Sequence, residues 1–106
     1  MTAFAVARLT GVKMGPEIVT YLREIDATLA PFDGKFIIHG GAKIELEGTW
    51  PDDLIVIAFP SLAAARAWYD SPAYREILPL RTNNSSGVAM LIDGVDPDHK
   101  AWDILT

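Results

Sequence analysis

One histidine of the sequence, His39, has the chemistry of proton transfer. It stands directly before the glycine pair Gly40-Gly41, where the missing side chains would let a ligand or a second backbone come close. An imidazole takes up and releases protons near neutral pH, so His39 is the candidate catalytic residue. The alternative is a histidine that is hydrogen-bonded at the end of a strand.

Arg81 has the chemistry of anion binding. It follows Pro79 at the end of a helical segment. Its planar guanidinium could bind a carboxylate through two parallel hydrogen bonds, which makes Arg81 a candidate binding residue. A structural role is equally compatible with the sequence, because the same group also pairs with a neighbouring aspartate or with exposed carbonyl groups.

Glu47 is a further candidate, because its carboxylate could orient the imidazole of His39 or act as a base. If the intervening strand is regular, the two residues share a face but lie about 26 Å apart, at about 3.3 Å per residue. Contact between them therefore requires the chain to bend at Gly40-Gly41. A structural ion pair is the favoured interpretation of Glu47.

Three aromatic residues, Trp68, Tyr69 and Tyr74, surround the junction between two short helical segments. They could form the wall of a binding pocket, with phenol hydroxyl groups pointing inward. Packing in an ordinary hydrophobic core explains the same residues and is the favoured interpretation. Ser71 lies between them in the position of a helix cap, and no G-x-S-x-G nucleophile motif surrounds it.

The composition argues against several kinds of chemistry. The 106 residues contain no cysteine, which rules out disulfides, thiolate metal sites and a cysteine nucleophile. The two histidines belong to no motif with ligand spacing, so we expect no metal and no cofactor. A net charge of −5 argues against nucleic acid as a partner. With no membrane-spanning run and no signal-peptide pattern, we expect no membrane and a cytoplasmic location.

The apolar pattern predicts the elements that must position these residues. Ile18, Leu22, Ile25 and Leu29 follow helical spacing and form the apolar stripe of the first helix. In chain order we predict a strand at 2–12, a helix from Gly15-Pro16 to near Pro31, one long bent strand at 35–47, a hairpin connection at 48–53, a strand at 54–59, a helix at 62–70, a short helix from 72 to 78 that Pro79 ends, and a strand at 88–92.

This βαββαβ order predicts an α+β fold, the ferredoxin-like sandwich with a four-stranded antiparallel sheet. We assign residues 1–95 to that domain and residues 96–106 to an acidic C-terminal tail, with Trp102 as its apolar anchor. Two helices can cover only one face of the sheet, yet three strands carry apolar residues on both faces. A homodimer that packs sheet to sheet is the simplest way to bury the second face.

Several pieces of the chain match a known family pattern: GKFIIHGG at 34–41, LEGTW at 46–50, FPS at 59–61, ARAWYDSPAY at 65–74 and LR at 80–81. With these pieces the sequence resembles the small bacterial proteins of domain-of-unknown-function family 1330, within the dimeric α/β-barrel superfamily. Relatives commonly carry arginine where this chain has His39, so a fixed positive charge is not carried over to that position.

The resemblance implies a dimeric α/β barrel, but the family has no established reaction to carry over. Members of the superfamily include cofactor-free monooxygenases, haem-degrading enzymes and small-molecule lyases or isomerases, which place their pocket between the sheet and the helices. That likeness is one of fold and does not assign a reaction.

We therefore expect a homodimer that binds a small neutral or acidic compound and could act on it without a cofactor. The expected site combines His39 as the catalytic residue with the binding residues Glu47, Trp68, Tyr69, Tyr74 and Arg81. The alternative is a non-catalytic structural or regulatory dimer, in which the aromatic residues are core and the polar strand face is merely solvated. Convergence of these side chains on an open cavity would distinguish the two.

Overall fold

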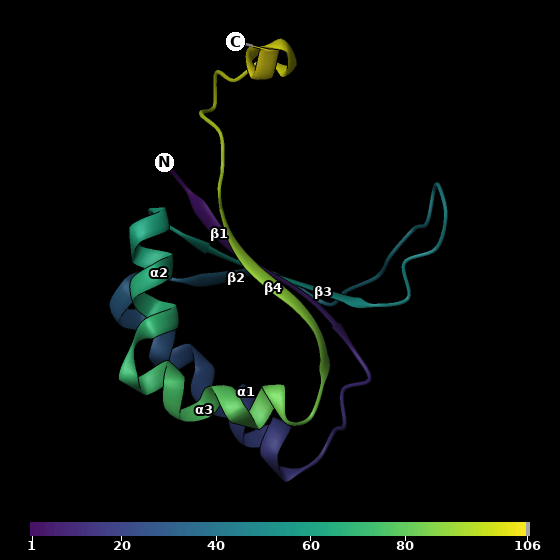
Figure 1. Ribbon diagram of the computed structural model, residues 1–106, viewed down its shortest axis with the longest axis vertical. Coiled ribbons are helices and arrows are strands. Elements are labelled where there is room, and N and C mark those ends of the chain that lie inside the picture. The colour runs from purple at the N-terminus through teal and green to yellow at the C-terminus, as the bar shows by residue number, and fades with distance from the viewer. Residues whose placement is uncertain (106) are drawn as a thin grey trace.

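The computed structural model describes residues 1–105 and is built on a four-stranded antiparallel sheet with strand order β2-β3-β1-β4 (Figure 1). Three α-helices and two short 3₁₀ helices accompany the sheet. The elements are β1 (Ala3–Thr10), α1 (Pro16–Leu29), η1 (Ala30–Phe32), β2 (Lys35–His39), β3 (Asp53–Phe59), α2 (Leu62–Asp70), α3 (Pro72–Thr82), β4 (Ser86–Asp93) and η2 (Ala101–Leu105). This order and topology confirm the predicted ferredoxin-like α+β sandwich.

The strand register decides which side chains face the helices. In the centre of the sheet, Ala5 of β1 is paired with Ile57 of β3 and with Leu91 of β4. Side chains alternate between the two faces along a strand, so the alanines at positions 3, 5 and 7 all point towards the helices. Against this face the helices build the core, which centres on the buried residues Tyr21, Ile25, Leu29, Ile57, Phe59, Ala65, Trp68, Tyr74, Ile77 and Leu78.

The helix starts lie where the capping residues predict them. Pro16 is the first residue of α1, and the hydroxyl oxygens of Ser61 and Ser71 accept hydrogen bonds from the backbone N–H groups of Ala64 and Tyr74 at the starts of α2 and α3. The predicted end at Pro79 is wrong, since α3 continues through it to Thr82. Pro79 is exposed, and so is Arg75, the residue whose carbonyl would accept the N–H that proline lacks.

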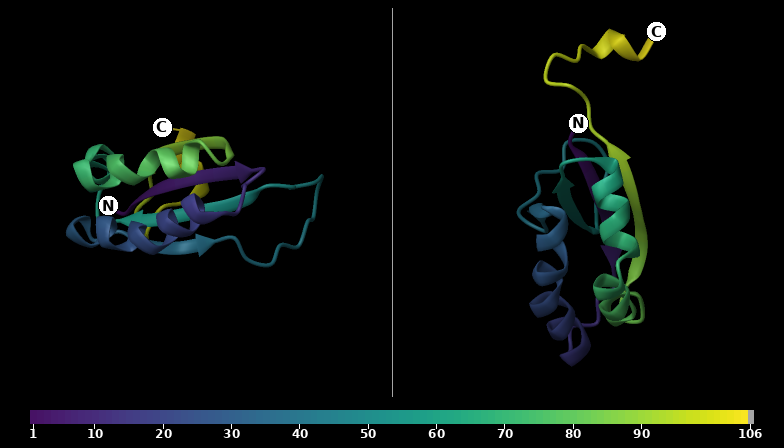
Figure 2. Two further views of the ribbon diagram at one scale, coloured as in Figure 1. Left: turned by 90° about the horizontal axis from the view of Figure 1, so that it is seen from below. Right: turned by 90° about the vertical axis from the view of Figure 1, so that its left-hand side faces the viewer.

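The predicted long bent strand at 35–47 is also wrong. Strand β2 ends at His39, and residues 40–52 form a loop, here called the arm, that projects from the sheet beside β3 (Figures 1 and 2). Gly40 and Gly41 have φ angles of 71° and 105°, values that take the chain out of the extended conformation. Lys43 Nζ then closes the arm on itself by donating to the carbonyl oxygens of Trp50 and Asp52, at 3.0 and 2.9 Å.

A β-bulge changes the direction of the end of β2. The pairing with β3 shifts register between Phe36 and Ile38, so that Phe36 lies opposite Ile57 and His39 lies opposite Ile55. Both residues therefore face the helices. A regular strand would have placed His39 on the opposite face from Phe36, together with Glu45 and Glu47.

The second face of the sheet carries apolar side chains with no cover from residues 1–105. On β4, Val88, Met90 and Ile92 remain 62%, 55% and 45% exposed. The chain after β4 leaves the body and ends in η2 (Figures 1 and 2). Trp102 of η2 is 69% exposed, so the prediction that it anchors the tail is wrong for this chain alone. None of the helices within residues 1–105 is long and apolar enough to cross a lipid bilayer.

Candidate functional site

A cavity of about 470 Å³ lies between the sheet and the helices. This volume is in the range of pockets that hold small organic molecules. Its walls are mostly apolar, and the side chains that line it include Ala5, Ala7, Leu9, Ile18, Ile25, Ile55 and Leu91. The alanines of β1 leave the space that larger side chains at these positions would fill.

Two tyrosines from different helices meet at one side of this cavity. The hydroxyl oxygens of Tyr21 in α1 and Tyr74 in α3 are 2.7 Å apart, which makes a hydrogen bond between the two phenols. Their rings meet edge to face with centroids 6.2 Å apart. Only 7% of Tyr21 and 2% of Tyr74 are exposed. This bond joins α1 to α3 and directs polar atoms towards an otherwise apolar space.

Arg81 lies beside this tyrosine pair in the last turn of α3. Burial disfavours its charge, but interactions with the hydroxyl groups of Tyr74 and Tyr21 outweigh burial, and the pKa of Arg81 is raised. Burial also raises the pKa of the Tyr21 phenol well above its usual range, and the neighbouring Tyr74 adds to this effect. At physiological pH, Arg81 is therefore cationic and Tyr21 is a neutral hydrogen-bonding group.

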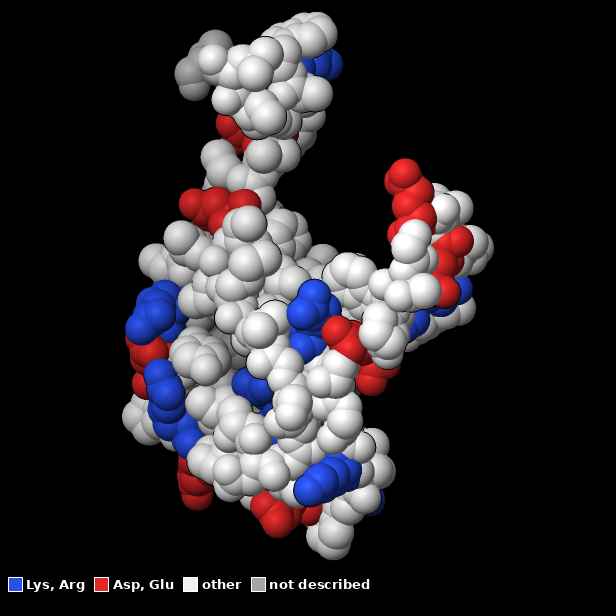
Figure 3. All heavy atoms as spheres, turned by 45° about the vertical axis from the view of Figure 1, so that its right-hand side comes forward, with Lys and Arg blue, Asp and Glu red and all other residues white. Residues whose placement is uncertain are grey.

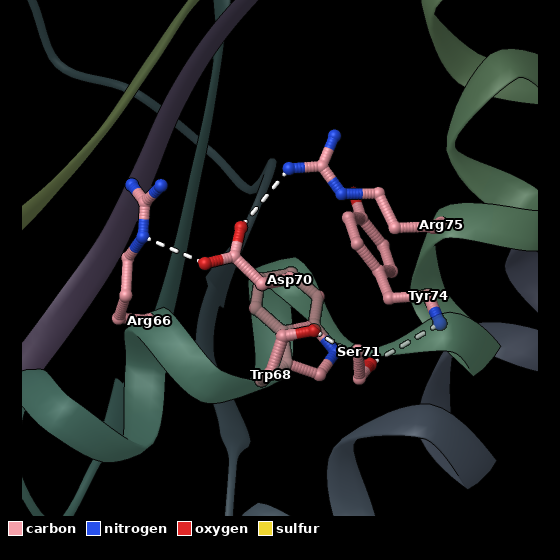
Figure 4. A network of polar contacts seen from close by, with 6 residues as sticks. All are labelled: Arg66, Trp68, Asp70, Ser71, Tyr74 and Arg75. Atoms are coloured by element: carbon pink, nitrogen blue, oxygen red, sulfur yellow. Dashed lines mark hydrogen bonds and ion pairs between the residues drawn. The ribbon is translucent and has the colours of Figure 1, made fainter.

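Trp68 is mainly a core residue with an edge on the cavity. It is 3% exposed, and its Nε1–H donates to Thr28 Oγ1 over 3.0 Å. Its ring lies on that of Tyr74, with centroids 4.1 Å apart. Ser71 Oγ donates to the carbonyl of Trp68 and accepts from the N–H of Tyr74, at 2.7 and 3.3 Å (Figure 4). The turn between α2 and α3 thus fixes both aromatic rings.

A charged network borders the cavity near Tyr69. Asp70 pairs with Arg66 at 2.8 Å and with Arg75 at 3.0 Å (Figure 4). The hydrogen bond from Arg75, helped by Arg66, lowers the pKa of Asp70. The guanidinium of Arg75 also lies 4.8 Å from the centre of the Tyr69 ring. The carboxylate of Asp70 is thus shared between Arg75 and Arg66, the second arginine of the cavity lining.

His39 reaches the same cavity from the edge of the sheet. Its ring stacks on Phe36 with centroids 4.5 Å apart and an angle of 15° between the planes. The side chain is exposed and lines the cavity beside Gly40. An imidazole in this position can reach both the cavity and solvent, which is what a proton-transferring group needs.

Five of the six residues that the sequence proposed for the site line this one cavity: His39, Trp68, Tyr69, Tyr74 and Arg81. Glu47 does not join them. It stands on the arm and lines a separate hollow there, and Figure 3 shows the acidic side chains of the arm away from the main body.

Tyr21 is the residue of the cavity that the sequence reasoning missed. The predicted stripe of α1 contained Leu22, but Leu22 is 39% exposed and Tyr21 is buried in its place. Tyr21 is three positions after Ile18 and four before Ile25, a spacing that fits the buried face equally well. The signal was therefore present in the helical periodicity.

The raised pKa of Tyr21 predicts a pH dependence of stability. Above about pH 10, the ordinary value for tyrosine, the unfolded chain releases this proton while the folded protein keeps it. Tyr21 therefore leaves the free energy of unfolding unchanged below about pH 10 and lowers it above that pH, by up to about 1.4 kcal/mol per pH unit. The free energy of unfolding, measured with urea from about pH 9 to 11, should fall less steeply with pH for Tyr21→Phe than for the wild type. Equal slopes for the two proteins would contradict the burial of this phenol.

Solved structures with the same architecture include several bacterial proteins. A protein of unknown function from Rhodopseudomonas palustris aligns with a TM-score of 0.65 and 19% identity, over 91% of this chain and 84% of its own. SnoaB, a cofactor-independent oxygenase from Streptomyces nogalater, aligns with a TM-score of 0.61 and 16% identity, over 93% and 98% of the two chains. A dimeric ferredoxin-like protein of unknown function from Jannaschia aligns with a TM-score of 0.55 and 14% identity, over 85% and 98%.

At these identities the likeness establishes the fold and leaves the chemistry open. None of the curated proteins compared with the chain matches it. The model of one family, the domain of unknown function DUF1330, matches residues 2–95, which is most of the chain and includes all the residues of the cavity. The protein therefore belongs to the DUF1330 family, as the pattern of its residues 34–81 indicates.

Proposed function

We propose that the protein is a homodimer that binds a small organic molecule, neutral or acidic, in the cavity between its sheet and its helices. The single observation that carries the proposal is the convergence of His39 from β2 and of Tyr74 and Arg81 from α3 on one largely apolar cavity. A core that served stability alone would fill this space, because interiors of proteins are close-packed.

The homodimer rests on the uncovered face of the sheet. Val88, Met90 and Ile92 of β4 form an exposed apolar row there, and Met90 and Ile92 lie opposite Val6 and Phe4 of β1. Monomeric proteins rarely expose contiguous apolar surfaces larger than a few hundred Å². A second copy packed on this face would bury it, and the ferredoxin-like neighbour from Jannaschia, which is dimeric, supports this arrangement.

Two alanine positions of β1 test whether the cavity is a binding pocket. Ala7 lines the cavity, whereas Ala3 is 0% exposed and lies outside its lining. Ala7→Phe should fill the cavity, keep the stability of the wild type within about 1 kcal/mol and abolish binding of a neutral apolar probe such as naphthalene-2-carboxamide. Ala3→Phe should instead overpack the core and lower the free energy of unfolding by about 1 to 3 kcal/mol. Calorimetric titration and urea unfolding measure the two effects.

The contrast between the two positions decides the result. Equal destabilisation by both substitutions would mean that the space at Ala7 is already filled. Undiminished binding of the probe to a folded Ala7→Phe protein would place its binding site elsewhere.

A charge on the uncovered sheet face tests the homodimer. Ile92 lies opposite Phe4 of β1 on that face and is 45% exposed. Light scattering should give twice the mass of one chain for the wild type and a single chain mass for Ile92→Glu, because the residue opposite the buried charge is apolar and cannot pair with it. Val19→Glu on the outer side of α1 is the control and should stay dimeric. A wild type that is monomeric at micromolar concentration would disprove the homodimer.

A second candidate function is a reaction on the bound molecule without a cofactor, with His39 as the proton-transferring group. The bulge in β2 favours this function, because it turns His39 towards the cavity while the ring stays open to solvent. An imidazole so placed could take a proton from a carbon next to a carbonyl group and return one from water. The non-catalytic dimer is the alternative.

Hydrogen exchange at carbon tests this reaction. In heavy water, the wild type should speed the uptake of deuterium by the apolar ketone 2-tetralone about 100-fold relative to His39→Gln, as followed by proton NMR. The matched control is His99→Gln, since His99 lies outside the cavity lining and its variant should retain the wild-type rate. Equal rates for the wild type and His39→Gln would favour the non-catalytic dimer.

A further inference from the structure

Arg81 carries a positive charge that no carboxylate of residues 1–105 neutralises. The ion pairs among these residues join Arg8 to Asp52, Arg66 and Arg75 to Asp70, and His99 to Asp103. The neighbours of the Arg81 guanidinium are instead the hydroxyl groups of Tyr21 and Tyr74. Uncharged phenols can accept hydrogen bonds from a guanidinium but do not cancel its charge.

The tyrosine pair has one hydrogen to spare. Each phenol has a single O–H, and the 2.7 Å bond between Tyr21 and Tyr74 uses one of the two hydrogens. The other remains for a third acceptor. Beside it stands the guanidinium of Arg81, which has five N–H donors and no acceptor. This side of the cavity therefore offers hydrogen-bond donors and positive charge to whatever occupies it.

The position of Arg81 is fixed by the loop that follows α3. Its carbonyl oxygen accepts from the hydroxyl of Ser85 at 2.8 Å and from the N–H of Asn84 at 3.1 Å. The side-chain amide of Asn84 also donates to Leu80 and to Glu17 in α1, at 2.8 and 3.2 Å. The backbone at Arg81 is thus held in place before any ligand binds, which lowers the entropic cost of binding.

The rest of the cavity limits the charge of a ligand. Leu9, Ile18 and Ile55 line it with groups that form no hydrogen bonds. The carboxylate of Asp53, exposed at the N-terminal end of β3 and also part of the lining, would repel a second negative charge. Arg66 contributes little to this field, because it pairs with Asp70, which it shares with Arg75, and because its side chain is 68% exposed, so that solvent screens its charge. Arg81 is the one partly buried arginine of the lining, which suits a ligand with one negative charge.

From this arrangement we infer that the cavity binds a monocarboxylate with an apolar body. The carboxylate lies against the guanidinium of Arg81 and accepts the spare hydrogen of the Tyr21–Tyr74 pair. A guanidinium fork matches the two oxygens of a carboxylate. The apolar body extends over Ala7 and Ile55 towards His39. This inference rests on the small-molecule pocket proposed above and narrows the ligand to one chemical class.

Calorimetric titration with two probes of equal shape tests the inference. Naphthalene-2-carboxylate carries the charge, and naphthalene-2-carboxamide keeps the size and the apolar body without it. The wild type should bind the carboxylate about 10- to 100-fold more tightly than the amide, the usual gain for hydrogen bonds to a charged group. Arg81→Gln should remove most of this preference, because it weakens binding of the charged carboxylate far more than binding of the neutral amide.

Three further variants separate charge, geometry and the phenol pair. Arg23→Gln removes one positive charge from the outer side of α1, away from the cavity, and should keep the preference of the wild type. Arg81→Lys keeps the charge without the fork and should give an intermediate preference, and it replaces Arg81→Gln if that protein does not fold. Either phenol alone keeps one free hydrogen, so the double variant Tyr21→Phe/Tyr74→Phe is needed to remove this donor, and it should bind the carboxylate several-fold more weakly than the wild type.

The outcomes distinguish this inference from the pocket on which it rests. If neither probe binds to the wild type, the pocket itself is disproved, and the inference with it. If both probes bind equally well, the pocket stands and the monocarboxylate is disproved. A preference that survives in Arg81→Gln would also overturn the inference, because the charge would then be bound elsewhere. An unchanged carboxylate affinity in the double variant Tyr21→Phe/Tyr74→Phe would remove the phenol pair from the assignment.

Discussion

The size of the side chains along β1 is the constraint on which the rest of the structure depends. β1 is the central partner of both β3 and β4, so its helix-facing residues form the floor under α1, α2 and α3. These residues are small at positions 3, 5 and 7. At Ala3 the large rings of Phe59 and Trp68, with centroids 5.4 Å apart, occupy the space and make a solid core. At Ala7 no ring fills the space, and the sandwich stays hollow. β1 thus supports one half of the sandwich that is fully packed, at Ala3, and one half that is hollow, at Ala7.

The polar groups of the hollow half follow from the way the helices are joined. Because Tyr21 and Tyr74 come from different helices, their hydrogen bond holds α1 and α3 together at the depth where apolar packing is incomplete. Two buried phenols satisfy each other here, which avoids the cost of an unpaired polar group. Arg81 then completes the cluster from the last turn of α3, and its charge is stabilised by the phenol oxygens rather than by an acid. The hydrogen bond that joins α1 to α3 and the hydrogen-bond donors that face the cavity therefore belong to one cluster of side chains.

Much of the fold could be predicted from the sequence, because proline, serine and alternating apolar residues act locally. The helix starts at Pro16, Ser61 and Ser71 and the antiparallel order of four strands follow from such signals. The errors come from effects beyond local pattern. The bulge between Phe36 and Ile38 depends on the pairing with β3, and it moved His39 to the cavity face. The positive φ angles of Gly40 and Gly41 turned an alternating segment into the arm, which separated Glu47 from the site. Five of the six proposed residues line the cavity, whereas Tyr21 was missed because a helical register through Leu22 fits the apolar stripe equally well.

The hollow half bears on the choice between a binding protein and a purely structural dimer. Filling a cavity with a methyl or larger apolar group commonly stabilises a protein, so an unfilled space of this size is a cost that packing alone does not explain. A structural dimer would need only the outer face of the sheet, where Val88, Met90 and Ile92 already supply the apolar surface. It would have no use for a cation held against two phenols on the opposite face. The two faces of β1 are thus suited to separate tasks: the outer face to association with a second copy, and the inner face to a ligand whose own atoms complete the packing that the alanines leave open.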